Sequence, residues 1–178
     1  MERNSGIVID EHISLRPLES GDAQRIFAIL DGFRERMRIW LPFVDYTLSP
    51  DDSAQFVEAV ARSGEEVFAV ICDGTFIGIV GFRSTEREND RTEIGYWLSP
   101  EYHGRGIMTH CVRAVCQYAF DRLSMHRIAI KCAVGNSASR AIPRKLGFTF
   151  EGIERGGEKM SDGRYADIEV YSLTANDR

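Results

Sequence analysis

The sequence lacks the features that would direct it to a membrane or to nucleic acid. No hydrophobic run approaches the roughly 20 residues that span a bilayer, and the polar N-terminus has no apolar segment of the signal-peptide kind. Positive charge is also scarce, because 22 basic residues face 27 acidic ones and the net charge is −5. These absences argue against an anionic membrane or a nucleic acid as partner, and we expect a cytoplasmic protein.

Residues that bind metals or form disulfides are few and scattered. The cysteines lie in apolar segments typical of a core, and no two of them have Cys-x-x-Cys spacing. The histidines are also far apart from one another. The residues concerned are Cys72, Cys111, Cys116, Cys132, His12, His103, His110 and His126. We therefore expect reduced core cysteines rather than disulfides, and no metal site.

The composition is that of an ordinary globular protein, with 43% hydrophobic and 28% charged residues. A chain of 178 residues is long enough to bury a substantial core in one domain. We find no internal repeat, low-complexity tract or linker. We expect a single domain over residues 1–178, with its core from about residue 12 to residue 175 and a loose terminus over residues 1–6.

The central feature is a strand that ends in a glycine turn and opens a helix. Residues 92–98 are apolar and β-rich, Pro100 stops them, and Gly104 and Gly106 precede a long helical pattern. The first amides of a helix lack intrahelical acceptors, and the helix dipole favours negative charge there. Glycine allows positive φ and close backbone approach. The turn predicts a main-chain anion site, although its spacing matches neither Gly-x-Gly-x-x-Gly nor a Gly-Lys-Ser/Thr loop.

Strand and helix patterns alternate along the rest of the chain. Strands are expected at residues 12–15, 67–71, 76–82, 92–98, 126–134, 148–151 and 164–173, and helices at 20–30, 32–40, 50–63, 107–123 and 137–146. The first helix has Ser20 or Asp22 as its expected cap, and Ser49 caps the third. Strands 92–98 and 126–134 flank a helix in a βαβ crossover, so they should be parallel neighbours.

Turns and loops complete this expectation. Asp73-Gly74 and Asp162-Gly163 predict tight hairpins, and the polar run 84–91 predicts a longer turn. Residues 41–47 are aromatic and have no period, so we expect a loop there. That loop either covers the core or forms one wall of a substrate cleft.

Five segments carry a family signature: residues 93–97, 103–109, 136–140, 145–148 and 171–173. In this order they resemble the GNAT acetyltransferase superfamily, specifically its ribosomal-protein N-terminal acetyltransferase (RimJ/RimL-like) branch. The resemblance covers the chain from about His12 onward. It implies an α/β (α+β) GNAT fold, with a mixed, mainly antiparallel twisted sheet, one splayed parallel strand pair and helices on both faces.

The resemblance implies acetyl-CoA as cosubstrate and no metal. Its diphosphate is expected on the amides of residues 103–108 with the Thr109 hydroxyl in reach, and its pantetheine arm between the splayed strands. The implied cofactor-binding residues are Trp97, Leu98, His103, Gly104, Arg105, Gly106, Ile107, Met108, Thr109, Asn136 and Ser139. Asn136 also fits an ordinary helix cap, and Arg105 fits a solvated turn residue. His103 and Met108 depart from the family pattern, and Met108 suggests a more crowded helix N-terminus.

The implied reaction is direct attack of an amine on a thioester in a ternary complex. Glu93 is the candidate base, with a structural acid paired to Arg or Lys as the alternative. Ser139 is the candidate acid, with hydrogen bonding at the helix start as the alternative. Tyr165 and Asp167 are further candidates for the amine site. Lys131 stands where some relatives have a catalytic acid, so that role does not transfer.

The resemblance also bears on the acceptor of the acetyl group. The branch implies a protein N-terminal α-amine, and a ribosomal protein is the first hypothesis. A small amine such as a polyamine, amino acid or antibiotic is the alternative within the enzyme class. A non-catalytic acyl-CoA-binding sensor is the alternative outside it, motivated by His103 and Met108. The family also leaves a homodimer open.

Overall fold

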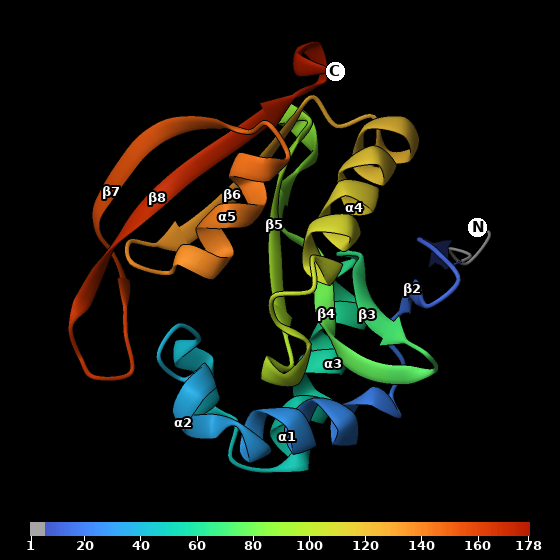
Figure 1. Cartoon of the computed structure of the whole chain (residues 1–178), viewed down its shortest axis with the longest axis vertical. Helices are drawn as coiled ribbons and strands as arrows, with labels where there is room; N and C mark the ends of the chain where they lie inside the picture. Colours follow the sequence, from blue (N-terminus) through green and yellow to red (C-terminus); the bar gives the residue numbers. More distant parts are fainter. Residues whose placement is uncertain (1–5) are drawn as a thin grey trace.

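The computed structural model describes residues 6–178 and shows helices packed on an open eight-stranded sheet (Figure 1). The sheet order is β1-β2-β3-β4-β5-β6-β8-β7, and among the described strands only the β5–β6 pair is parallel. The strands are β1 Ile7–Val8, β2 Ile13–Pro17, β3 Val67–Cys72, β4 Thr75–Glu86, β5 Arg91–Leu98, β6 Arg127–Ala133, β7 Thr149–Lys159 and β8 Tyr165–Thr174. The expected mixed fold is confirmed. The terminus expected over residues 1–6 lies outside the described residues, apart from Gly6.

The predicted hairpins are confirmed, although two strand lengths were wrong. Asp73 and Gly74 both have positive φ, at 47° and 78°, which suits the tight turn between β3 and β4. β4 continues to Glu86, past a bulge at Ser84, so the turn expected over residues 84–91 is shorter. β7 is also much longer than residues 148–151, because it runs on through bulges along β8.

The helices lie close to their expected positions. They are α1 Asp22–Gly32, α2 Arg34–Met37, α3 Pro50–Ser63, α4 Ile107–Leu123 and α5 Ser137–Lys145, with short 3-10 turns η1 Pro42–Tyr46, η2 Arg87–Asn89, η3 Pro100–Tyr102 and η4 Ala175–Asp177. Ser49 caps α3 as predicted, in a capping box with Asp52. The loop expected at residues 41–47 is instead largely the 3-10 turn η1.

The expected cap of α1 was wrong. The residue before the helix is Gly21, and no side chain caps it there. Asp22 is the first helical residue and is fully buried, with its carboxylate bound by Arg16 at 2.7 Å through both oxygens and by Arg25 at 2.9 Å. Asp22 therefore serves as the anchor of a buried ion pair between β2 and α1 rather than as a cap.

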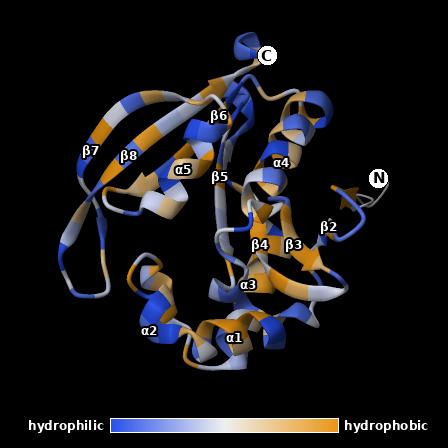
Figure 2. Ribbon diagram, viewed as in Figure 1, coloured by the Kyte–Doolittle hydropathy of each residue, from blue (hydrophilic) through white to orange (hydrophobic). Residues whose placement is uncertain are grey.

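Two cores occupy the two faces of the sheet. Alternate side chains of β5 point to opposite faces, so Ile94 and Leu98 join the core under α4, while Trp97 joins the core shared with α1 and α3. The predicted apolar stripe of α4 is confirmed, since Cys111, Val115 and Ala119 are completely buried. Figure 2 shows hydrophobic residues concentrated on β3 and β4 and hydrophilic residues at the far end of the β7–β8 hairpin.

Candidate active site

The parallel strands β5 and β6 part after a short contact. Their ladder has three residue pairs, of residues 91–93 with residues 127–129. Beyond it, residues 94–98 pair with β4 alone and residues 130–133 pair with β8 alone. The facing edges of the two strands therefore keep backbone N–H and C=O groups that no neighbouring strand uses. This opening, which we call the strand gap, confirms the expected parallel pair.

The glycine turn follows directly from the end of β5. Gly104 and Gly106 both have a φ of 77°, a conformation that L side chains rarely adopt. Gly106 is the residue that precedes α4; no side chain caps the helix there, and its first turn has no acidic residue. Within residues 6–178, the amides of residues 104–109 donate to no protein acceptor. A row of free donors therefore lies at the positive end of α4.

The amide of His103 differs from this row and corrects one expectation. It donates to the Pro100 carbonyl at 3.3 Å, which ends the turn η3. The His103 ring instead lies with Nε2 2.9 Å from the carbonyl oxygen of Leu98. The donor row therefore begins at Gly104, and His103 packs its ring against the end of β5.

The other residues of the turn divide between core and surface. The side chains of Ile107 and Met108 are each 6% exposed and lie in the core, so they leave the outside of the helix start clear. The crowding expected from Met108 is therefore absent. Thr109 is half-buried. The exposed guanidinium of Arg105 lies 5.0 Å from the centre of the Tyr102 ring and bonds a carbonyl of the turn, which matches the turn-residue alternative.

Trp97 and Leu98 end β5, but only Leu98 turns its main-chain groups toward the strand gap. The Ser99 amide donates to the Ile77 carbonyl, so Trp97 lies in a hydrogen-bonded pair with Ile79 and its N–H and C=O face β4. Each side chain is 7% exposed, and the two point into the cores on opposite faces of the sheet. The Trp97 ring meets Phe76 edge to face, at 6.4 Å between ring centres. Neither side chain is therefore available to a molecule in the gap. The main-chain contact expected at Trp97 is wrong, and the Leu98 carbonyl already lies 2.9 Å from His103 Nε2, which leaves the Leu98 amide.

The start of α5 brings polar groups to the far side of the strand gap. Asn136 accepts a hydrogen bond from the Ser139 amide at 3.2 Å, so it is the helix cap that the sequence indicated. The Ser139 hydroxyl donates to the Tyr96 hydroxyl at 3.3 Å, and the Tyr96 hydroxyl donates to the Ser139 carbonyl at 3.1 Å. Tyr96 was not singled out from the sequence, although it lies inside the family-like segment 93–97.

Two further groups near Ser139 keep their protons at neutral pH. Burial raises the pKa of the Tyr96 phenol well above its usual range. Burial, followed by the charge of Glu169, raises the pKa of the Cys132 thiol to about 11, while a hydrogen bond with Ser139 opposes the rise. Tyr96 lies on β5 and Cys132 on β6, so Ser139 stands between the two strands that part.

The carboxylate of Glu93 is occupied by a cation. Glu93 lies at the closed end of the strand gap, directly across from Arg83 on β4. The Arg83 Nε donates to it at 2.6 Å, and the carboxylate is 13% exposed. This geometry matches the structural alternative given for Glu93. Lys131 is similarly engaged, with its amine 2.7 Å from Glu154.

Three segments meet on the side of the sheet that carries α1 and α2. The Trp40 ring lies 3.4 Å from the position that a Cβ on Gly135 would occupy, just before Asn136. Ser161, near the tip of the β7–β8 hairpin, donates to the Arg38 carbonyl at 3.0 Å. We call the surface formed by residues 38–46, residues 134–136 and the hairpin tip the acceptor surface.

Tyr165 and Asp167, the two candidates on β8, differ in whether the side chain already has a structural partner. Tyr165 is 68% exposed near the hairpin tip. The Asp167 carboxylate accepts a hydrogen bond from the Gly156 amide at 2.7 Å, so it stabilises the bulged part of β7. Tyr165 therefore remains available to an acceptor, whereas Asp167 already has a structural partner.

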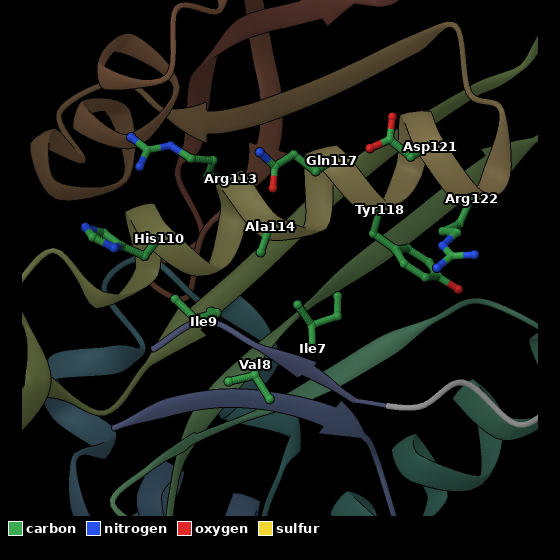
Figure 3. A pocket seen from close by; sticks show the side chains of 10 residues that line it. All are labelled: Ile7, Val8, Ile9, His110, Arg113, Ala114, Gln117, Tyr118, Asp121 and Arg122. Carbon is green, nitrogen blue, oxygen red and sulfur yellow. The ribbon is translucent and has the colours of Figure 1, made fainter. Parts of the chain in front are cut away.

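A separate cavity of about 390 Å³ lies between α4 and the segment of residues 7–9. Figure 3 shows side chains of α4, among them His110 and Tyr118, on the wall that faces Ile7 and Ile9. None of the predicted site residues lines this cavity. In the described part of the chain, no three His, Cys, Asp or Glu side chains gather as a metal site. Among residues 6–178, no helix is long and apolar enough to cross a membrane.

Comparisons with known proteins agree with this geometry. A family model described as an acetyltransferase (GNAT) domain matches residues 12–149. YdaF of Bacillus subtilis (strain 168), named as a candidate ribosomal N-acetyltransferase, is 34% identical over 173 residues, covering 93% of this chain and 92% of YdaF. The spermidine N(1)-acetyltransferase of Escherichia coli (strain K12) is 30% identical over 153 residues, covering 86% of this chain and 81% of that protein.

Among solved structures, the fold is shared with a RimL ribosomal L7/L12 alpha-N-protein acetyltransferase in complex with coenzyme A. The TM-score is 0.92 at 24% sequence identity, and the match covers 98% of this chain and 100% of that chain. At this identity the likeness is one of fold.

Proposed function

The chain belongs to the acetyltransferase (GNAT) family, which makes it an acyltransferase enzyme, and from this premise we propose that it transfers the acetyl group of acetyl-CoA to a primary amine. The resemblance drawn from the five sequence segments is thereby confirmed. One observation carries the proposal: a parallel strand pair ends after three residue pairs, beside a helix start whose amides are free. This combination suits a long ligand with an anion at one end.

Main-chain groups suit the separate parts of acetyl-CoA. The amides of residues 104–109 are suited to the diphosphate, with the Thr109 hydroxyl in reach. The unused edges of β5 and β6 match the amide groups of the pantetheine arm, and the Leu98 amide belongs to that edge, whereas the Trp97 backbone faces β4. Asn136 and Ser139 supply the contact at the start of α5. The predicted set is retained, except that the His103 amide is not a donor and the Trp97 backbone does not face the gap.

The residues of the strand gap have distinct roles in the proposed reaction. Acetyl-CoA supplies an activated thioester. The amine nitrogen forms the new C–N bond as the C–S bond breaks, so one proton leaves the amine and one reaches the sulfur. Glu93 is the candidate acceptor of the first proton, after release from Arg83, and Ser139 is the candidate donor of the second. Free amides along β5 are suited to the carbonyl oxygen as its charge develops.

A protein N-terminal α-amine is the proposed acceptor. The acceptor surface carries large exposed side chains that suit a peptide, since Trp40 is 37%, Phe43 42% and Tyr46 81% exposed. YdaF, similar over nearly the whole chain, is named for a ribosomal acceptor. A small polyamine is the second candidate, because a spermidine acetyltransferase is also 30% identical to this chain.

Release of the CoA thiol tests the proposal directly. Purified protein is mixed with acetyl-CoA and one of three acceptors: ribosomal-protein N-terminal peptides, polyamines or amino acids. We expect thiol release with peptides, and mass spectrometry should place the acetyl group on the α-amine. Release with polyamines alone would move the function to the second candidate. Tight acetyl-CoA binding without release on any acceptor would favour a non-catalytic sensor. A cytoplasmic location and a homodimer stay predictions.

A further inference from the structure

A proline inside α5 leaves the carbonyl of Ser139 without its normal partner. In an α-helix the carbonyl of one residue accepts from the amide four residues later. The residue four positions after Ser139 is Pro143, which lies inside α5 and has no N–H group. The Ser139 carbonyl therefore needs a donor from outside the helix.

Tyr96 supplies that donor from the opposite side of the strand gap. Its hydroxyl donates to the Ser139 carbonyl at 3.1 Å and accepts from the Ser139 hydroxyl at 3.3 Å. Tyr96 belongs to the part of β5 that has no pairing with β6. Two hydrogen bonds thus join β5 to the first turn of α5 at the place where the strands have already parted.

All three polar groups of Ser139 are consequently held. Its amide is bound by the Asn136 side chain at 3.2 Å, its carbonyl by Tyr96, and its hydroxyl by Tyr96 as well. A hydroxyl on a short side chain at a fixed backbone has little positional freedom. Because an acid must stand within hydrogen-bond reach of the group it protonates, such fixation matters for transfer to the thiolate.

We propose that Tyr96 is a positioning residue for Ser139: it replaces the helix donor that Pro143 lacks and thereby sets the Ser139 hydroxyl in the strand gap. This inference rests on the proposed function, because it gives Ser139 the role of proton donor to the CoA sulfur. The single hydroxyl proton of Ser139 points to the Tyr96 oxygen, so it turns from Tyr96 to the sulfur for the transfer, and solvent afterwards returns a proton to Ser139. Tyr96 acts through Ser139 and keeps its own proton on the Ser139 carbonyl.

The first test removes only the hydroxyl, in the variant Tyr96→Phe. We expect kcat to fall about tenfold, with the Kd for acetyl-CoA within about threefold of the wild-type value. Thiol release gives kcat, and calorimetry gives Kd. Tyr118→Phe is the matched control, because its hydroxyl donates to Glu66, away from the strand gap. This control should keep the wild-type kcat.

A double-mutant cycle separates positioning from general stability. If Tyr96 acts through Ser139, Tyr96→Phe should cost nothing further in a Ser139→Ala background. Pro143→Ala restores an amide donor for the Ser139 carbonyl, so in the Tyr96→Phe background it should recover kcat by about threefold or more. Thermal unfolding of each variant confirms that the folded protein is compared throughout.

Several results would overturn the inference while leaving the proposed function intact. They are a wild-type kcat in Tyr96→Phe, a wild-type kcat in Ser139→Ala, an equal Tyr96→Phe loss in both backgrounds, or no recovery on Pro143→Ala. Failure of the proposed function looks different, because the wild-type protein would then release no thiol from acetyl-CoA with any amine.

Discussion

At the scale of single residues, Gly106 combines a positive φ with a free amide at the start of α4. Its φ of 77° places it in the left-handed region, and its amide belongs to the donor row at the start of α4. A side chain at this position is strained and also stands beside the proposed diphosphate site. Gly64 has nearly the same conformation, with a φ of 74°, but it ends α3 and lies in open space. The two glycines therefore form a matched pair.

We predict that Gly106→Glu and Gly64→Glu lose similar stability but differ in cofactor binding. Each forces a side chain into the left-handed region, at a cost on the order of 1 kcal/mol. Only Gly106→Glu also places a carboxylate among the amides that suit the diphosphate, so its Kd for acetyl-CoA should rise about tenfold or more. Calorimetry and thermal unfolding measure both effects. A folded Gly106→Glu protein with wild-type affinity would contradict the proposed site.

The buried carboxylate of Asp22 should make the stability of the protein depend on pH. Its burial raises the pKa of the carboxyl, but the Arg16 guanidinium and the Glu19 amide outweigh burial, and the net pKa is lowered. Because the folded-state pKa is lowered, the ionised carboxyl stabilises the protein at any pH above its pKa in the unfolded chain, about 4. This stabilisation is lost as the pH falls through the folded-state pKa. We predict that Asp22→Asn costs about 3 kcal/mol near pH 7, at the lower end for a buried pair because both arginines are partly exposed.

The difference between wild type and Asp22→Asn should begin to narrow as the pH falls below about 4, the pKa in the unfolded chain, and should close as it falls through the lower folded-state pKa. Urea unfolding at pH 7, 5, 4 and 3 checks this. Glu151, which lies 2.6 Å from Arg127 through both oxygens but is more exposed, provides a comparison in Glu151→Gln with a smaller loss. A constant difference at every pH would show that the Asp22 charge is not responsible.

At the scale of elements, local chemistry specified most helices and turns. Periodicity and turn residues reveal features that depend on neighbours in sequence. These are the apolar residues at every fourth position of α4, the Ser49 cap and the Asp73-Gly74 turn. The full extent of β7 was not predictable in this way, because almost all of its side chains are exposed and no alternation marks it. The sequence indicates Asp22 as a possible cap because its partner Arg16 lies on another element, which no local pattern reveals.

In the candidate site too, some features follow from local sequence and others only from the fold. Gly104 and Gly106 were readable because positive φ demands glycine, and the cap role of Asn136 was readable from its spacing. The bond between Tyr96 and Ser139 joins residues 43 positions apart and follows no period, so only the fold reveals it. The engagement of the His103 amide by Pro100 depends on how the short turn η3 closes, which composition does not determine.

Two helix caps give a prediction at the element scale. Asn136 caps α5 beside the strand gap, and Ser49 caps α3 at a distance from it. We predict that Asn136→Ala and Ser49→Ala each cost about 1 kcal/mol of stability. Only Asn136→Ala should also weaken acetyl-CoA binding, by about threefold or more, because the Ser139 turn loosens. Equal affinities in the two variants would indicate that Asn136 is a cap and nothing else.

At the scale of the whole molecule, the sheet consists of two antiparallel parts joined by three residue pairs. One part is β1 to β5, and the other is β6, β8 and β7. The two parts are also linked through α4 and its core, which is continuous from β2 to β8. A ligand in the strand gap would contact both parts at once.

We predict that saturating acetyl-CoA slows hydrogen exchange at residues 94–98 and 130–133. These segments have strand partners on one side only, so a ligand in the gap would bond amides that water otherwise reaches. At a concentration of about 100 times Kd, the ligand should also add about 2.7 kcal/mol to the free energy of unfolding. β3, paired on both sides, is the internal control for local protection. Unchanged exchange in both gap segments would place the ligand elsewhere.

The three-pair junction between β5 and β6 also bears on how the protein behaves in storage. An edge strand with spare backbone groups is a template for strands of other molecules, and this sheet has two such edges at its centre as well as those at its rim. Acetyl-CoA in the gap would shield the central pair. We therefore expect protein stored without acetyl-CoA to aggregate sooner than protein stored with it. The cosubstrate would then determine storage lifetime as well as turnover.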